Sequence, residues 1–214
     1  MKDVIKFYRV KEEYGFFSNF APYPILLESF FWPTVEHYFQ AKKFNDFDLQ
    51  DRIRMLSSPM DAANEGRKRS NPLRSDWESA KDEVMRVAVR AKFFQSPELK
   101  KKILQTGDKK LVEHTSNDSY WADGGDGTGL NMLGVILMEI REELIAINPD
   151  PDVILPPWVA FPHISHFDMF WGMGSGEEYL ISWHEYFTSL RDKAAYKRIF
   201  PISAEWEDFY EHSD

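Results

Sequence analysis

The spacing of apolar residues in the first 150 positions predicts a mostly helical chain with a few short strands. The stretch "DVIKFYRV" is typical of a strand, and residues 16–29 form a second extended segment that prolines interrupt. Apolar residues that recur every three to four positions predict helices. These helices cover residues 34–44, 58–66, 75–95, 96–107 and 130–146. With a further short strand in "KLVEHT", we expect an α+β fold that is predominantly helical.

Small polar residues mark the predicted helix starts, because their side chains accept hydrogen bonds from the free N–H groups of the first turn. Thr34 and Ser58 are the expected N-caps of their helices, and Ser96 repeats the Ser-Pro start found at Ser58. Ser75 and Glu78 have the spacing of a capping box. These signals predict where each helix begins.

A proline-rich stretch, "NPDPDVILPPW", cannot continue a helix and marks a boundary near Asp150. The charge changes at the same place, since residues 151–214 hold four Lys or Arg against eleven Asp or Glu. We predict a first domain at residues 1–150 and an acidic, aromatic-rich helical extension at residues 151–214 that packs on it.

The extension carries four of the seven tryptophans. Residues 175–200 predict one helix, with Ser175 and Glu178 as its capping box, and residues 204–212 predict a short final helix. Two interpretations stay open. The extension is either a helical cap on the first domain or an element for specificity or partner binding that narrows the pocket.

Composition excludes several classes of site and partner. Without cysteine, the chain has neither disulfides nor thiolate zinc sites. His163 and His166 have ligand-like spacing without obvious carboxylate partners, so we expect no metal and no cofactor. No signal peptide or membrane-length apolar run is present, so we expect a soluble cytoplasmic protein without a membrane partner. The net charge of −9 argues against broad nucleic-acid binding but permits a local basic pocket for a small anion.

Lys81 is the first candidate for chemistry. It lies on the same predicted helix face as Trp77, Val84 and Ala88, and so interrupts an apolar stripe. A partly desolvated lysine there has its charged form disfavoured, which suits a base or a Schiff-base nucleophile. The alternative is a lysine whose stem packs while its ammonium reaches water.

Glu36 and Gln40 lie one turn apart on a predicted helix, together with Lys43. An acid and an amide in this arrangement can jointly bind a hydroxylated substrate, and the Glu can act as acid or base. The alternative is a solvated helix face with a Glu–Lys pair.

Four cations lie within "EGRKRSNPLR". Arg67, Arg69 and Arg74 are candidates for clamping a phosphate, because guanidinium groups match its oxygens. A solvated surface run is the alternative.

The stretch "SYWADGGDGTGLN" places four of the chain's 11 glycines directly before a predicted helix. It matches neither a dinucleotide-binding fingerprint nor an EF-hand. Aromatic residues and an apolar helix anchor its two ends, which argues against a linker. We expect a loop whose backbone approaches a substrate closely at Gly125, with Asp123 and Asn131 beside it; an ordinary tight turn is the alternative.

Several stretches together resemble the YbiA-like, or NADAR, family: "SNFAPYPI", "FWPTVEHYFQAKKF", "SSPMDAANEGRKRSNPLRSDWESAKDEVM" and "LVEHTSNDSYWADGGDGTGLNMLGVILMEIREEL". The resemblance runs from about Lys6 to Leu144 without large gaps. It implies hydrolysis of N-glycosidic bonds in phosphoribosylamino-pyrimidine intermediates of riboflavin synthesis, which releases ribose 5-phosphate. Other members of the family remove ADP-ribose from modified guanine, so an ADP-ribosyl glycohydrolase is the alternative. A non-catalytic nucleotide-binding module is a third possibility.

The same resemblance implies which residues line the active site. The matched motifs carry over the candidates Glu36, Trp77, Lys81, Trp121, Asp123 and Asn131, with Arg67 and Arg69 for the phosphate. The expected partner is therefore a small phosphorylated ribosyl-nucleobase.

Cleaving a C–N glycosidic bond requires stabilisation of a sugar cation and protonation of the nitrogen leaving group. We expect Glu36 and Asp123 to divide these tasks, while Trp77 and Trp121 stack on the base. In the alternative mechanism, Lys81 intercepts a ring-opened imine as a Schiff base.

Overall fold

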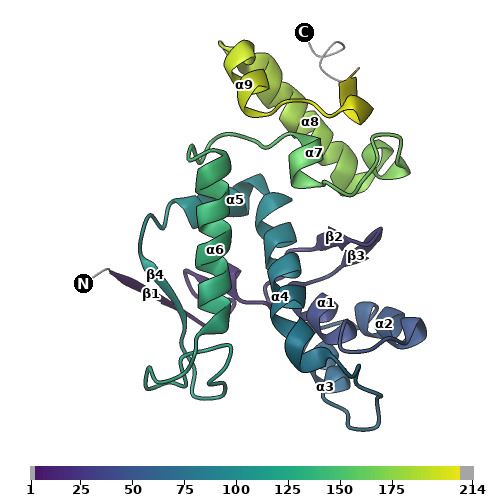
Figure 1. Ribbon diagram of the computed structural model, residues 1–214, viewed down its shortest axis with the longest axis vertical. Helices are drawn as coiled ribbons and strands as arrows, with labels where there is room; N and C mark the ends of the chain where they lie inside the picture. Colours follow the sequence, from purple (N-terminus) through teal and green to yellow (C-terminus); the bar gives the residue numbers. More distant parts are fainter. Residues whose placement is uncertain (1–2, 208–214) are drawn as a thin grey trace.

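Two long helices, α4 (Trp77–Phe94) and α6 (Met132–Ile147), run side by side through the centre of the protein in a computed structural model that describes residues 3–207 (Figure 1). Ion pairs tie them together. The Arg86 guanidinium lies 3.0 Å from Glu139, and that of Arg90 lies 2.8 Å from Glu143. The charged positions of α4 therefore face its neighbour rather than open solvent alone.

Four short strands form two separate pairs. β1 (Val4–Phe7) pairs in parallel with β4 (Lys110–Glu113), and β2 (Ile25–Leu27) pairs antiparallel with β3 (Phe30–Trp32). The β1–β4 pair joins segments about a hundred residues apart and packs on α6. With nine α-helices and these strands in the described part of the chain, the expected helical α+β fold is confirmed.

The remaining helices of the first 150 residues are α1 (Val35–Ala41), α2 (Phe47–Arg54), α3 (Pro59–Gly66) and α5 (Pro97–Leu104), with a short 3-10 turn at Gly15–Phe17. Three of the predicted N-caps are confirmed. The side chains of Thr34, Ser58 and Ser96 each accept a backbone N–H of the first turn.

The predicted capping box at Ser75 is wrong. α4 begins at Trp77, its N-cap is Asp76, and no side chain caps it. Arg74 binds the Asp76 carboxylate at 2.6 Å, while Glu78 pairs with Lys81 instead of turning back to the helix start. Local ion pairs have displaced the cap.

The extension contains α7 (Pro157–Ala160), α8 (Gly174–Ser189) and α9 (Lys193–Ile199), with 3-10 turns at Met169–Gly172 and Ala204–Trp206. The single helix predicted for residues 175–200 is therefore two helices, since Asp192 caps a new start. Ser175 is no cap, because α8 already begins at Gly174 after Met173. Residues 208–212 of the predicted final helix lie outside the described residues.

A buried lysine fastens the start of the extension. Lys100 is 1% exposed and donates to the backbone oxygens of Asp150 and Val153, both at 2.8 Å. Burial lowers the pKa of Lys100 to about 8. Farther along, the Phe31 and Phe170 rings lie 5.8 Å apart. Figure 1 places α7–α9 at the end of α4 and α6 that is remote from the glycine loop, residues 119–131. Within residues 3–207, no helix is long and apolar enough to cross a membrane.

Candidate active site

Helix α1 buries its predicted acid and amide. Glu36 is 6% exposed and Gln40 is 4% exposed, so the solvated-face alternative is wrong for both. The Gln40 amide donates to Glu36 Oε1 at 2.7 Å, while its own Oε1 has no partner among the described residues. Gly66 makes room for this pair, because a Cβ there would lie 2.0 Å from Gln40 Oε1. Helix α3 thus packs α1 closely enough to fix the Glu36 carboxyl group.

The surroundings of Glu36 favour its protonated form. Burial raises its pKa, and the Gln40 hydrogen bond together with the charges of Lys43 and Arg67 offsets only part of that effect. Lys43 lies beside it, with its ammonium 5.6 Å from the centre of the Phe39 ring. Burial lowers the pKa of Lys43 in turn. A protonated carboxyl group near a cation can act as a general acid.

Glu113, at the end of β4, is a second acid that the sequence interpretation missed. Burial raises its pKa to about 7, and repulsion from Asp118, Glu36 and Asp123 adds to the rise. In a parallel pair, matched residues share a face, so Glu113 lies on the same face as Phe7 and, two positions earlier, Leu111. The sequence signal for Glu113 is a charged residue two positions after an apolar residue, Leu111, on the same face of the predicted strand.

Aromatic rings join α1, α4 and the glycine loop. The Phe39 ring lies 5.1 Å from Trp77 and 5.3 Å from Trp121, and Trp121 lies 5.2 Å from Tyr120. Trp77 is 5% exposed, so it forms a wall, whereas Trp121 is only partly buried and keeps a surface for a ligand. The structure therefore brings Glu36, Trp77 and Trp121 together around Phe39.

Lys81 contacts the same aromatic cluster through Tyr120, and its amine stays protonated. Its ammonium lies 3.9 Å from the centre of the Tyr120 ring and 2.6 Å from Glu78. The hydrogen bond to Glu78 is the main reason that the pKa of Lys81 is raised. The expected disfavoured charge is therefore wrong, because the stem packs while the head reaches a carboxylate.

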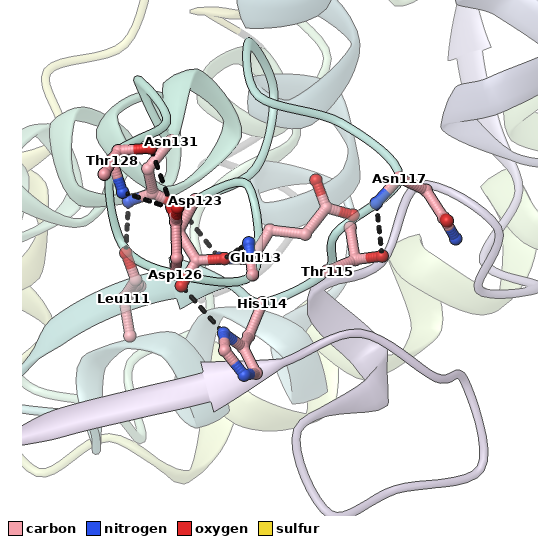
Figure 2. Close-up of polar contacts among 10 residues, drawn as sticks. Leu111, Glu113, His114, Thr115, Asn117, Asp123, Asp126, Thr128 and Asn131 are labelled. Atoms are coloured by element: carbon pink, nitrogen blue, oxygen red, sulfur yellow. Dashed lines mark hydrogen bonds and ion pairs between the residues drawn. The ribbon is translucent and has the colours of Figure 1, made fainter.

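Asp123 lies in the glycine loop against a histidine, as Figure 2 shows. Its carboxylate lies 2.7 Å from His114 Nδ1 and accepts the Gly125 N–H at 2.9 Å. Burial alone would raise the pKa of Asp123, but the bonds from His114 and Gly125 hold it below its ordinary value. Gly125 has φ of 81°, a conformation that favours glycine. The Asp123 carboxylate is thus already engaged by His114 and by the Gly125 N–H.

Asn131 connects the loop to β4. It adopts a left-handed backbone with φ of 54°, and its side chain is buried. Its amide accepts the Glu113 N–H and donates to the Leu111 oxygen, both at 2.9 Å (Figure 2). The Asn131 side chain therefore fixes the backbone of β4 next to Glu113.

The arginines of the predicted phosphate clamp separate. Arg67 is exposed at the end of α3, and its charge acts on both Glu36 and Lys43. Arg69 is exposed and has no polar partner among the described residues. Arg74 is bound to Asp76 and is not free to bind an anion. Only Arg67 is shown to act on the acid.

The predicted site residues thus form two groups. Glu36, Gln40, Trp77, Lys81 and Trp121 gather around Phe39, with Arg67 at the edge. Asp123, Gly125 and Asn131 line a separate cavity beside β1 and β4. Among the residues that the structure describes, no group of three or more His, Asp or Glu side chains is placed to hold a metal ion.

The sequence and the fold both match known proteins. Residues 6–145 match the NADAR domain. The chain is 57% identical over 141 residues to N-glycosidase YbiA of Escherichia coli strain K12, which covers 66% of this chain and 88% of that protein. It is 44% identical over 144 residues to a Riboflavin biosynthesis protein of Vibrio vulnificus, covering 67% of this chain but 39% of that longer protein. The NMR structure of E. coli YbiA superposes with a TM-score of 0.64 at 56% identity, over 68% of this chain and 88% of the other.

Proposed function

Because this chain belongs to the NADAR domain family and is an N-glycosidase, we propose that it hydrolyses phosphoribosylamino-pyrimidine intermediates of riboflavin biosynthesis. The products are ribose 5-phosphate and the free aminopyrimidine. The observation that carries the proposal is the pair of acids with raised pKa, Glu36 on α1 and Glu113 on β4, beside an aromatic cluster.

The two acids divide the work of hydrolysis. Protonated Glu36 gives a proton to the leaving nitrogen as the C–N bond breaks, and ionised Glu113 takes a proton from the water that adds to the anomeric carbon. Glu113 is suited to the second task because its pKa of about 7 lies close to neutral pH. The base that leaves stacks on Trp121, which is only partly buried.

Asp123 takes a supporting place in this mechanism. Its carboxylate is bound to His114 and Gly125, whereas Glu113 interacts electrostatically with Glu36. Lys81 supplies positive charge beside the base. Its raised pKa keeps the amine protonated, which disfavours attack as a Schiff-base nucleophile.

A product assay on two substrates tests the proposal. Purified protein is incubated with 5-amino-6-(5-phosphoribosylamino)uracil and, separately, with ADP-ribosylated guanosine. We expect ribose 5-phosphate from the first and a loss of that release in Glu36→Gln and Glu113→Gln. ADP-ribose from the second substrate alone would move the function to reversal of ADP-ribosylation. If neither substrate is cleaved, the proposed substrate class is rejected.

A further inference from the structure

A cavity of about 230 Å³ lies on the face of the β1–β4 pair opposite Glu113. Side chains alternate between the faces of a strand. Ile5, Phe7 and Leu111 are buried on the inner face, whereas the cavity is lined by the other set, which includes Lys6, Lys110 and His114. Residues of the glycine loop line its other side. The cavity is therefore distinct from the cluster around Phe39.

The floor of this cavity carries two free cations. Lys6 and Lys110 come from neighbouring strands at diagonal positions, since Val4 pairs with Lys110 and Lys6 with Val112. Across residues 3–207, neither ammonium has a hydrogen-bond or ion-pair partner. Many other lysines of this acidic chain are paired with carboxylates, for example Lys81 with Glu78 and Lys101 with Asp152. Two unpaired ammonium groups in one cavity suit an anion with several oxygens, such as a phosphate.

The wall of the cavity adds two acceptors for hydroxyl groups. Thr128 donates its N–H and its hydroxyl to Asp126 Oδ1, at 2.9 and 2.7 Å, and no described residue donates to Oδ2. Asp123 binds His114 through Nδ1, and Figure 2 shows the other ring nitrogen turned away from it. When Nδ1 carries the proton in a neutral ring, Nε2 is an acceptor. Asp126 Oδ2 and His114 Nε2 can therefore each accept a hydrogen bond from a hydroxyl group of a sugar.

We propose that this outer cavity is a binding site for a phosphorylated sugar, with Lys6 and Lys110 on the phosphate and Asp126 and His114 on the hydroxyls. Its volume is below the range of about 300–1,000 Å³ typical of sites for drug-sized ligands, which suits one sugar phosphate rather than a dinucleotide. Asp123, which supports the proposed reaction, also lines the cavity, but no residue of the Phe39 cluster does, so binding here can be tested separately from turnover.

Binding of ribose 5-phosphate to the full chain tests the site. Amide signals are followed by NMR during titrations with ribose 5-phosphate, inorganic phosphate and ribose. We expect saturable changes at residues 110–114 and 124–129, and a dissociation constant about tenfold or more weaker in the double variant Lys6→Gln/Lys110→Gln. The matched control, Lys11→Gln/Lys109→Gln, removes the same charge from positions outside the cavity and keeps wild-type affinity.

A third variant separates the sugar from the phosphate. Asp126→Asn is expected to weaken ribose 5-phosphate relative to inorganic phosphate, because it alters an acceptor for the sugar hydroxyls while removing a negative charge near the phosphate. Amide changes confined to the surroundings of Trp121 and Glu36 would overturn the proposal, as would equal affinity in wild type and the Lys6→Gln/Lys110→Gln variant. Inorganic phosphate binding as tightly as ribose 5-phosphate would reject the sugar contacts. The amide spectrum reports in each case whether the variant is folded.

Discussion

Replacing Glu113 by glutamine is predicted to stabilise the protein at alkaline pH while removing the proposed general base. Glutamine keeps the size and hydrogen-bonding ability of the side chain but cannot ionise. In the folded protein, the pKa of Glu113 is raised from 4.5 to about 7, mainly by burial. Each pKa unit corresponds to about 1.4 kcal/mol, so ionised Glu113 costs the fold roughly 3 kcal/mol at most.

The sign of this effect depends on pH. Below 4.5 the carboxyl group is protonated in both the folded and the unfolded chain, and the variant has no advantage. Between 4.5 and about 7 the unfolded chain ionises first, so wild-type stability falls as the pH rises. Above that window the full penalty is present. The advantage of Glu113→Gln should therefore grow from near zero at acid pH to roughly 3 kcal/mol at pH 8.

Urea unfolding at pH 5 and pH 8 measures the difference. Wild type and Glu113→Gln are compared with Glu185→Gln, a control that changes an exposed carboxylate on α8. The control should show no comparable growth with pH. A Glu113→Gln protein that is no more stable than wild type at pH 8, or whose advantage is the same at both pH values, would refute the environment described for this acid.

Four further predictions follow from the same geometry. Glu36→Gln should lower kcat/KM for ribose 5-phosphate release by about 10²–10⁴ with an unchanged circular dichroism spectrum, and a loss below tenfold would remove it as the acid. Lys81→Ala should abolish turnover in a folded protein, because the charge over Tyr120 is lost; a borohydride-trapped adduct on wild-type Lys81 would instead establish the Schiff-base route. Deleting residues 151–214 should give an insoluble remainder, since it removes Val153, one of the two backbone acceptors of buried Lys100, whereas a folded enzyme with altered substrate preference would support a specificity role. Activity should survive EDTA, and a loss that magnesium restores would contradict this.

Local signals were sufficient for much of the helical framework. Thr34 and Ser58 cap the helices that the sequence predicts, because each needs only a hydroxyl and a free N–H within one turn. Ser75 failed where a longer side chain intervened, since Arg74 engages Asp76 and Glu78 pairs forward. Capping patterns do not record competition between neighbouring charges.

Only part of the candidate site could be predicted from the sequence. Glu36, Trp77, Lys81 and Trp121 were named and do converge, while their catalytic roles remain predictions. Glu113 was missed because its importance depends on burial, which follows from long-range packing.

The resemblance gave Asp123 a share of the catalytic work with Glu36, and that role stays a prediction. Loop position alone gives no side-chain direction, and the structure directs the Asp123 carboxylate to His114. The direction follows from the tertiary fold, since the loop folds back on β4, where Asn131 binds its backbone.

Glu113 ends strand β4 and His114 follows it directly, with the two side chains on opposite faces of the β1–β4 pair. Because side chains alternate with a period of two, inserting or deleting one residue in this strand would exchange them. The imidazole of His114 would then point to the inner face, and the Glu113 carboxylate would point to the face that carries Lys6 and Lys110. Substitutions along the strand change one contact at a time, but a change of length alters both faces together. The roles proposed for Glu113 and His114 therefore depend on the length of this strand as well as on the identity of the two residues.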